Sequence, residues 1–326
     1  MKTKVLSLLR TSRDYISGQE LCEQFGVSRT AVWKVINQLK EDGYEIDAVT
    51  NKGYKLKSYP DILNKYEIES RLQTKWAGRE VVFFKEIGST NVEAKVLAEK
   101  GFGHGTLVAA DYQTGGKGRR GRSWHSPKGS TIAMSLILKP DLETEHASML
   151  TLIQAMAVAK AIEEICGLET QIKWPNDILV NEKKVCGILT EMNLEMMEIS
   201  SIIIGTGINV NQESFPEDIS EIATSLKIEK KRTQSRADLI ERICELFEEY
   251  FELFMETKNL TGFLEEYNAH LVSRGRMVKV LDPNGKFTGE ALGINDLGEL
   301  LVKKEDGEVI NVYAGEVSVR GIYGYV

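Results

Sequence analysis

Residues 115 to 124 read Gly-Gly-Lys-Gly-Arg-Arg-Gly-Arg-Ser-Trp, so four glycines alternate with four cations ahead of a tryptophan. Glycine weakens helices and strands and lets the backbone approach a ligand closely. The stretch is therefore predicted to be a loop whose two ends are held by regular structure. Lysine and arginine donate to phosphate or carboxylate oxygens, and tryptophan offers a flat ring on which a base can stack. We expect the loop to be flexible when empty and ordered when it closes over an anion.

Alone, this run is equally consistent with a solvated basic surface loop or an arginine–glycine arm that binds nucleic acid. It is not a Walker phosphate loop, because Gly118 follows Lys117 where that motif requires Ser or Thr. The surrounding sequence favours an enzyme site. Gln113 precedes the run, Lys173-Trp174-Pro175-Asn176-Asp177 follows it, and Gly205-Thr206-Gly207-Ile208-Asn209 comes after an apolar segment.

Together these motifs resemble those of the biotin–protein ligases. With the N-terminal segment described below, the chain is similar over nearly its whole length to the bifunctional bacterial biotin ligases that also repress the biotin operon. Two positions depart from the family pattern, because Lys117 stands where Arg is usual and Gly115 where Ala is usual. Lysine keeps the charge but lacks the planar two-pronged donor. We expect activity to survive, with altered affinity or retention of the intermediate.

The resemblance implies an activity in two half-reactions. The carboxylate of biotin attacks the α-phosphate of ATP, giving biotinyl-5′-AMP and pyrophosphate. A lysine of a biotin carboxyl carrier protein, in acetyl-CoA carboxylase or pyruvate carboxylase, then attacks the mixed anhydride. Because two anions meet in the first step, cations and Mg²⁺ should supply most of the catalysis through position and charge. The catalytic candidates are Lys117, Arg119, Arg122 and Lys173.

The resemblance also assigns two overlapping sets of ligand contacts. The biotin set is Ser89, Thr90, Asn91, Gln113, Lys117, Gly118, Arg119 and Lys173. The ATP and adenylate set is Arg119, Arg122, Trp124, Lys173, Asn176 and Asn209. Lys173 is implied to bridge the biotin carboxylate and the adenylate phosphate. No metal ligand is assigned, since Mg²⁺ is expected to arrive with the substrate; Asp177 is only a candidate.

The start of the helix expected over Val92 to Lys100 has two compatible readings. Thr90 and Glu93 fit a capping box, which would be sufficient as a structural role. A helix start also presents free N–H groups, which suit the polar ureido ring of biotin. We expect both roles to hold.

The first 57 residues follow the pattern of a winged helix-turn-helix. Helices are predicted over Lys2 to Arg10, over Gly18 to Phe25 and from the capping Ser28 to Gly43, followed by a hairpin around Asn51-Lys52-Gly53. The helix-turn-helix itself spans Gly18 to Asn37. The DNA-binding candidates are Ser28, Arg29, Thr30, Trp33, Lys34, Asn37 and Lys52. This segment holds ten basic and seven acidic side chains, against a net charge of −7 for the whole chain. Lys52 at the tip of the wing and the capping Ser28-Arg29 favour DNA over protein contacts.

Composition limits the remaining classes. The four cysteines lie far apart with no CxxC pair, which favours free thiols in a reducing compartment. No apolar run approaches the ~18 residues of a membrane span, and no signal peptide is recognisable. We therefore expect a cytoplasmic protein with no membrane partner.

The expected fold is α+β and multidomain. Residues 1–59 form the winged helix-turn-helix, 60–271 a mixed α/β biotin- and ATP-binding catalytic domain, and 272–326 a C-terminal domain. The resemblance implies a class II synthetase-like catalytic domain. Short strands and regular turn signals predict a small β-barrel similar to SH3 domains at the C-terminus. The linker is Ser58 to Asp61, where a proline disfavours helix.

The favoured function is a ligase that also represses biotin synthesis or uptake genes, as a homodimer on operator DNA when adenylate is bound. Three alternatives stay open. One is a monofunctional biotin ligase with a vestigial DNA-binding domain. The others are a transcription factor without catalysis and a lipoate ligase.

Overall fold

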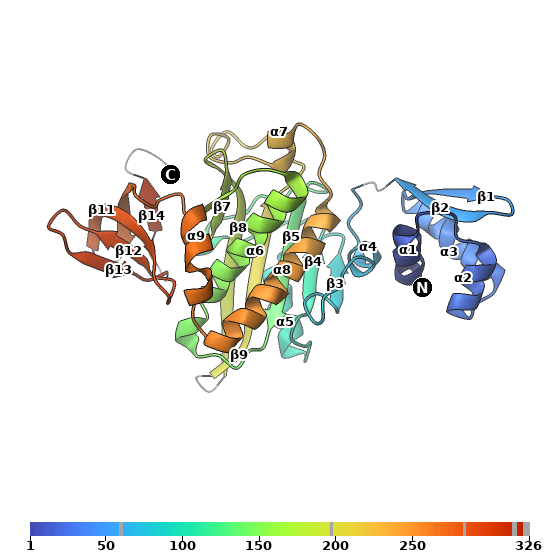
Figure 1. Ribbon diagram of the computed structural model, residues 1–326, viewed down its shortest axis with the longest axis horizontal. Coiled ribbons are helices and arrows are strands. Elements are labelled where there is room, and N and C mark those ends of the chain that lie inside the picture. The colour runs from blue at the N-terminus through green and yellow to red at the C-terminus, as the bar shows by residue number, and fades with distance from the viewer. Residues whose placement is uncertain (59–60, 196–197, 283–284, 315–317, 322–326) are drawn as a thin grey trace.

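A computed structural model of the chain describes residues 1–58, 61–195, 198–282, 285–314 and 318–321. Three parts follow one another along the long axis of the molecule, with the N-terminal helices at one end and a small sheet at the other (Figure 1). The predicted linker residues Tyr59 and Pro60 lie outside the described residues.

The N-terminal part confirms the predicted winged helix-turn-helix. Its helices are α1 (Lys2–Thr11), α2 (Gly18–Phe25) and α3 (Arg29–Glu41), and its wing is the antiparallel pair β1 (Glu45–Val49) and β2 (Gly53–Ser58). The Ser17 and Ser28 hydroxyls accept from the amides of Glu20 and Ala31, so each serine caps its helix. The apolar faces of these elements meet in one buried cluster.

The central part is built on a seven-stranded sheet in the order β3-β4-β5-β9-β8-β7-β6, in which only β3 and β4 run parallel. The strands are β3 (Val81–Phe84), β4 (Leu107–Ala110), β5 (Thr131–Leu138), β6 (Gln171–Lys173), β7 (Asp177–Val180), β8 (Lys183–Glu195) and β9 (Glu198–Asn209). The strands β8 and β9 are the longest of this sheet and pair with each other from Cys186 and Ile208 to Glu195 and Glu198.

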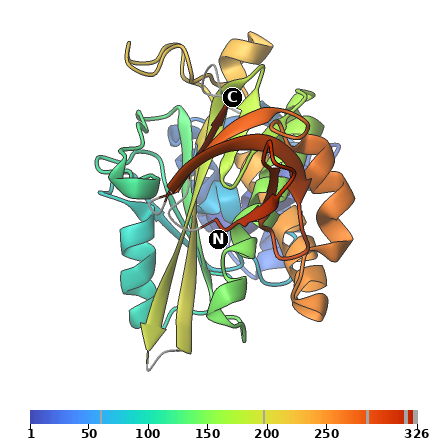
Figure 2. The same ribbon diagram turned by 90° about the vertical axis from the view of Figure 1, so that its left-hand side faces the viewer.

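Helices cover both faces of this sheet. The long α6 (Met149–Cys166) and α8 (Arg236–Thr257) pack over one face, while α5 (Thr90–Glu99) covers the other through Ala94 and Leu97. Figure 2 shows α5 on the opposite side of the sheet from the orange helices. Shorter helices are α4 (Lys65–Glu69), α7 (Leu226–Lys230) and α9 (Leu264–His270), with 3-10 turns η1 (Arg119–Gly121), η2 (Thr144–His146) and η3 (Thr261–Phe263).

The C-terminal part is an antiparallel sheet, in agreement with the predicted all-β unit. Its strands, in the order β13-β12-β11-β10-β14, are β10 (Met277–Asp282), β11 (Gly285–Ile294), β12 (Leu300–Lys303), β13 (Val309–Val312) and β14 (Ser318–Gly321). Its buried side chains join the core of the central part.

Two further observations bear on the expectations from sequence. Cys166, Cys186 and Cys244 are buried free thiols and Cys22 is a half-buried one, as expected. Among the described residues we find no helix with the length and apolar character needed to cross a membrane.

Candidate active site

The glycine–arginine loop connects β4 to β5 and folds into a short hairpin of its own. The amide of Gly118 donates to the carbonyl of Arg122 at 2.7 Å, and the amide of Trp124 donates to the carbonyl of Gly116 at 2.9 Å. At the tip of this hairpin, Arg120 takes a φ of 58° and Gly121 takes 73°. The hairpin turns the chain so that Trp124 returns to the sheet.

Beneath this loop lies an inner cavity, bounded by the start of α5 and by the middle of β8 and β9. The structure brings seven of the eight predicted biotin residues to its walls. They are Ser89, Thr90, Asn91, Gln113, Lys117, Gly118 and Arg119. Trp124 and Asn176, predicted for the adenylate, line the same cavity.

The start of α5 is held by Gln113 rather than by a capping box. The Oε1 of Gln113 accepts from the Thr90 amide at 2.8 Å and from the Thr90 hydroxyl at 3.1 Å. Ser89 occupies the cap position but makes no side-chain cap bond. The predicted Thr90–Glu93 box is therefore wrong, because a carboxamide from a distant strand end satisfies the orphan donor instead.

Asn91 is anchored from three directions at the base of the cavity. Its Nδ2 donates to the carboxylate of Glu191 at 2.8 Å and to the Leu189 carbonyl at 3.2 Å. Its Oδ1 accepts from the Ser135 hydroxyl at 2.6 Å. These bonds fix the side chain against β9.

Two glycines of β9 make room for the side chains above the sheet. A Cβ on Gly205 would overlap the amide of Asn91, and a Cβ on Gly207 would lie 2.6 Å from the indole Nε1 of Trp124. Residues two apart share a face of a strand, so Thr206 points to the opposite face, where its hydroxyl accepts from Gln154. The Gly-Thr-Gly motif is therefore a bare floor for the cavity.

An outer cavity adjoins the inner one and shares several walls with it, including Arg119, Trp124 and Asn176. It encloses 570 Å³ and is strongly cationic. Its lining contains one carboxylate, that of Asp177, and six cations: Arg119, Arg120, Arg122, Lys173, Lys184 and Arg320. Six cations around one carboxylate fit a polyanionic ligand.

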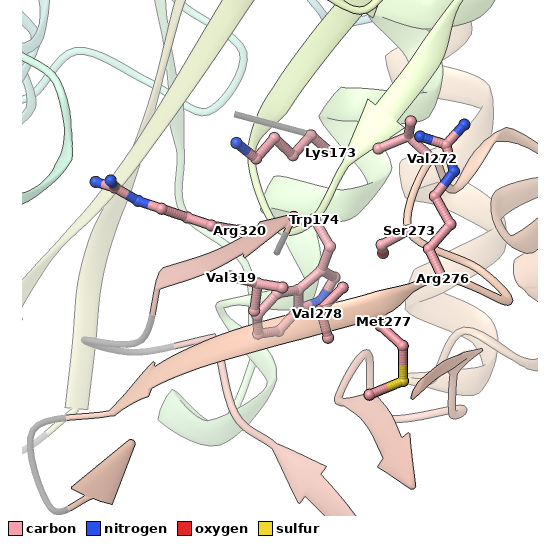
Figure 3. A pocket seen from close by; sticks show the side chains of 10 residues that line it. Lys173, Trp174, Val272, Ser273, Arg276, Met277, Val278, Val319 and Arg320 are labelled. Carbon is pink, nitrogen blue, oxygen red and sulfur yellow. The ribbon is translucent and has the colours of Figure 1, made fainter. Parts of the chain in front are cut away.

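Burial governs the charge state of Lys173. The pKa of its ammonium group is lowered to about 8, mainly by desolvation and also by nearby Lys184, Arg320 and Arg122, while Asp177 opposes them. Figure 3 shows the side chains of Lys173 and Arg320 extending to the same side, away from Ser273 and Met277. A bound anion would strengthen the charged form of this lysine.

Arg119 ties the loop to the central and C-terminal parts of the chain. Its guanidinium donates to the Oδ1 of Asn176 at 3.0 Å and to the Ala314 carbonyl at 2.9 Å. One arginine thus joins the loop, the segment after β6 and the C-terminal sheet.

Family models match each of the three parts of the chain. Residues 84–209 match the biotin/lipoate A/B protein ligase family, residues 2–55 an HTH domain, and residues 274–320 the biotin protein ligase C terminal domain. The chain is 42% identical, over 94% of both chains, to the bifunctional ligase/repressor BirA of Bacillus spizizenii.

The chain belongs to the biotin–protein ligase family. The BirA of Escherichia coli is 29% identical to it over 97% of this chain and 96% of the relative. A biotin protein ligase from Aquifex aeolicus, solved in complex with biotin and ATP, aligns with a TM-score of 0.66 and 32% identity. That alignment covers 74% of this chain and 99% of the Aquifex chain.

In this biotin–protein ligase family member, Asn209 is not brought to the walls of either cavity. Its Nδ2 donates to the Thr224 carbonyl at 3.1 Å, and its Oδ1 accepts from Gln212 at 2.9 Å. Asn209 thus braces the segment after β9, whose Ile219 and Ile222 line the outer cavity.

Sequence reasoning missed three cations of the site: Arg120 in the loop itself, and Lys184 and Arg320 outside it. Lys184 lines both cavities, forms an ion pair with Asp177 at 2.6 Å, and places its ammonium group 5.5 Å from the ring centroid of Trp124. A lysine just after a tight turn reads as solvated in sequence. Only the pairing of β7 with β8 turns it toward the loop.

The predicted DNA-binding residues lie on one helix and one turn of this family member. Arg29, Thr30 and Lys34 are exposed on α3, Trp33 is 59% exposed, and Lys52 is exposed at the tip of the wing. Asn37 is half-buried, and the Ser28 hydroxyl is used as the cap of α3. An exposed aromatic among cations suits a nucleic-acid surface better than a solvated helix face.

Proposed function

We propose that this chain is an ATP-dependent biotin–protein ligase and a biotin-dependent repressor. The carrying observation is the junction of the two cavities, where a small chamber whose walls carry amide and hydroxyl side chains opens into a larger, strongly cationic one across shared walls. The comparisons support both halves, since the relatives are bifunctional and residues 2–55 match an HTH domain.

In the proposed mechanism the ureido ring of biotin meets the start of α5 and the side chains of Asn91 and Gln113. Its carboxylate faces Lys173 and attacks the α-phosphorus of ATP, and the bond to the β-phosphate breaks to release pyrophosphate. Arg119, Arg122 and Lys173 offset the charge that gathers there. The acceptor lysine then attacks the carbonyl of the anhydride, AMP leaves, and the proton of the amine passes to solvent.

Mg²⁺ is proposed to arrive on the phosphates of the nucleotide. Asp177 is the carboxylate of the outer cavity, and a single carboxylate fits a magnesium ion that keeps water and phosphate as its other ligands. Lys184 holds that carboxylate in place through their ion pair.

Entry of biotin requires the loop to move. The inner cavity encloses only 50 Å³, well below the ~300 Å³ at which ligand pockets begin. The indole of Trp124 lies over Gly187 and Gly207 and occupies space on the floor of this cavity. We infer that this ring leaves the floor with its loop and returns over the adenylate.

Mass spectrometry of a carrier-protein lysine tests the ligase half. Incubation with biotin, ATP and Mg²⁺ should add one biotinyl group to that lysine, and omission of ATP should abolish the addition. If the carrier were lipoylated when lipoate replaces biotin, and were not biotinylated with biotin, the lipoate ligase alternative would be favoured.

Arg119→Ala should leave a folded protein that loses its adenylate faster than the wild type. The reason is that Arg119 joins the loop to Asn176 and the C-terminal sheet, and so holds the cover that excludes water from the anhydride. Retention is measured by rapid filtration of preformed biotinyl-5′-AMP. Lys128→Ala, an exposed cation beyond the same loop, is the control. Equal retention in both variants would refute the role.

The repressor half is proposed to work through adenylate-driven pairing of two chains, which presents two winged helices to a palindromic operator. Gel-shift titration should show operator binding tightened by biotin plus ATP, by roughly the 5- to 150-fold of common allosteric couplings. A chain lacking residues 1–59 should keep its ligase activity and lose this binding. If operator binding ignored both ligands, the chain would act as a ligase with a vestigial DNA-binding part.

Finer features of the fold belong to the same proposal. We place the domain boundaries at 59/60 and 271/272, and propose class II synthetase and SH3-like affinities for the second and third domains. With its cysteines free, the protein is proposed to act in the reducing cytoplasm on acetyl-CoA carboxylase or pyruvate carboxylase.

A further inference from the structure

Arg236, in the first turn of α8, is the largest fully buried side chain described and lies outside both cavities. Its Nε donates to Asp61 at 2.8 Å and its Nη1 to Asp111 at 2.7 Å. The same Nη1 donates to the Thr131 carbonyl at 3.3 Å, and the Arg236 amide donates to Asp61 at 2.9 Å. A guanidinium with 2% exposure thus bridges two carboxylates from distant segments.

One side of this bridge holds both ends of the glycine–arginine loop. Asp111 directly follows β4 and stands two residues before Gln113, which holds the start of α5. Thr131 is the first residue of β5, where the chain returns from the loop. Arg236 therefore fixes the two points between which the loop must open and close.

The other side of the bridge is Asp61, the last residue of the predicted linker. Asp61 also accepts from the Nδ2 of Asn211 at 2.7 Å. Asn211 begins the segment that carries Ile219 and Ile222 to the outer cavity. Asp61 is thus bonded to Arg236, which holds the ends of the loop over the inner cavity, and to Asn211, which begins the segment that lines the outer cavity.

Beyond Asp61, the chain is locked to the winged helix. Glu67 of α4 is 2% exposed and accepts from Arg10 of α1 at 2.8 Å and from the Tyr44 hydroxyl at 2.6 Å. Arg71 donates to Glu67 at 2.8 Å and also pairs with Asp238, on the same turn of α8 as Arg236. A displacement of Asp61 is therefore passed to a segment that holds the DNA-binding part.

We infer that Arg236 is a positioning residue that couples closure of the loop over the ligands to the placement of the winged helix. The inference rests on the proposed function and adds the route by which that site is regulated. Closure shifts Asp111 and Thr131, and Arg236 carries the shift to Asp61 and segment 61–71. A purely structural arginine would stabilise this region equally with and without ligand.

Hydrogen exchange of the full chain with biotin, ATP and Mg²⁺ tests the coupling. In the wild type, ligand should slow amide exchange over residues 61–71 by about fivefold or more. Arg236→Lys keeps the charge but loses the fork that reaches two carboxylates. In this variant the ligand effect on 61–71 should fall below about twofold, while protection of residues 89–91 persists.

Two controls keep the test decisive. Arg242→Lys changes a half-buried arginine of the same helix, paired with Glu164 and Glu245, and should behave as the wild type. If Arg236→Lys fails to fold, Asp111→Asn, which keeps an acceptor and removes one charge, should show the same selective loss.

Two outcomes would overturn the inference. One is amide exchange over residues 61–71 that does not respond to ligand in the wild type. The other is an equal response of that exchange to ligand in Arg236→Lys and the wild type. Pyrophosphate release is measured on the same samples. Its absence would refute the ligase and not the coupling, which the exchange data decide separately.

Discussion

Lys173→Gln should lower the rate of biotinyl-5′-AMP formation by about 10²–10³-fold, the usual cost of removing one preorganised charge donor. Glutamine preserves much of the length and polarity of the side chain but removes the cation between the two reacting anions. Burial has already removed water from the ammonium group of Lys173, so this desolvation precedes the binding of the two anions. Single-turnover pyrophosphate release measures the step without the carrier protein.

Two comparisons isolate the charge as the cause. Lys183→Gln alters an exposed lysine at the start of β8 and should react at the wild-type rate. The pH profile gives the second comparison. Because the free enzyme holds the Lys173 pKa at about 8, the cationic form is present below that pH and is lost as pH rises through it. The kcat/KM for adenylate formation should therefore fall above about pH 8.

Lys173→Arg should move that alkaline limb upward, since guanidinium stays protonated throughout the accessible range. An unchanged limb would assign it to another group. A Lys173→Gln chain that forms adenylate at the wild-type rate would remove this residue from the mechanism altogether.

Sequence reasoning located the site well where chemistry is written into short motifs. The loop, the helix start at Ser89 to Asn91 and Gln113 meet at one cavity although as many as thirty residues separate them. The N-terminal winged helix was also predictable, because its caps and periodic apolar faces are local signals. Ser28 makes the cap bond that the sequence indicated, and Ser17 caps α2 in the same way.

The sequence misled at positions whose contacts come from distant segments of the chain. Thr90 and Glu93 satisfy a local rule, yet Gln113 reaches the helix start and takes the position of the box. Lys184 looked solvated because nothing in its neighbourhood shows that β8 faces the loop. Arg236 carried no signal either, since an arginine at the start of an amphipathic helix reads as an exposed residue. Each depends on pairings formed only by the whole sheet.

Gly205→Ala should raise the KM for biotin by roughly 10²-fold, in line with the cost of a misplacement of about 1 Å in a site. The new Cβ would overlap the amide of Asn91 and lie 2.7 Å from its Cγ. Asn91 cannot yield cheaply, because it is 4% exposed and bonded to Glu191, Leu189 and Ser135. Either the side chain or the start of α5 must leave its place.

Gly103→Ala is the matched control, because a Cβ there meets nothing within 4 Å. It should leave both the KM for biotin and the melting temperature unchanged. The double variant Gly205→Ala with Asn91→Ala separates clearance from contact. Removal of the clashing amide should recover only part of the lost melting temperature, because the bonds of Asn91 to its three partners are lost as well. The KM should stay high because the biotin contact is gone. If the double variant recovered both the melting temperature and the KM for biotin, Asn91 would only pack against the strand. A normal KM in Gly205→Ala alone would show that β9 can move without cost to the cavity.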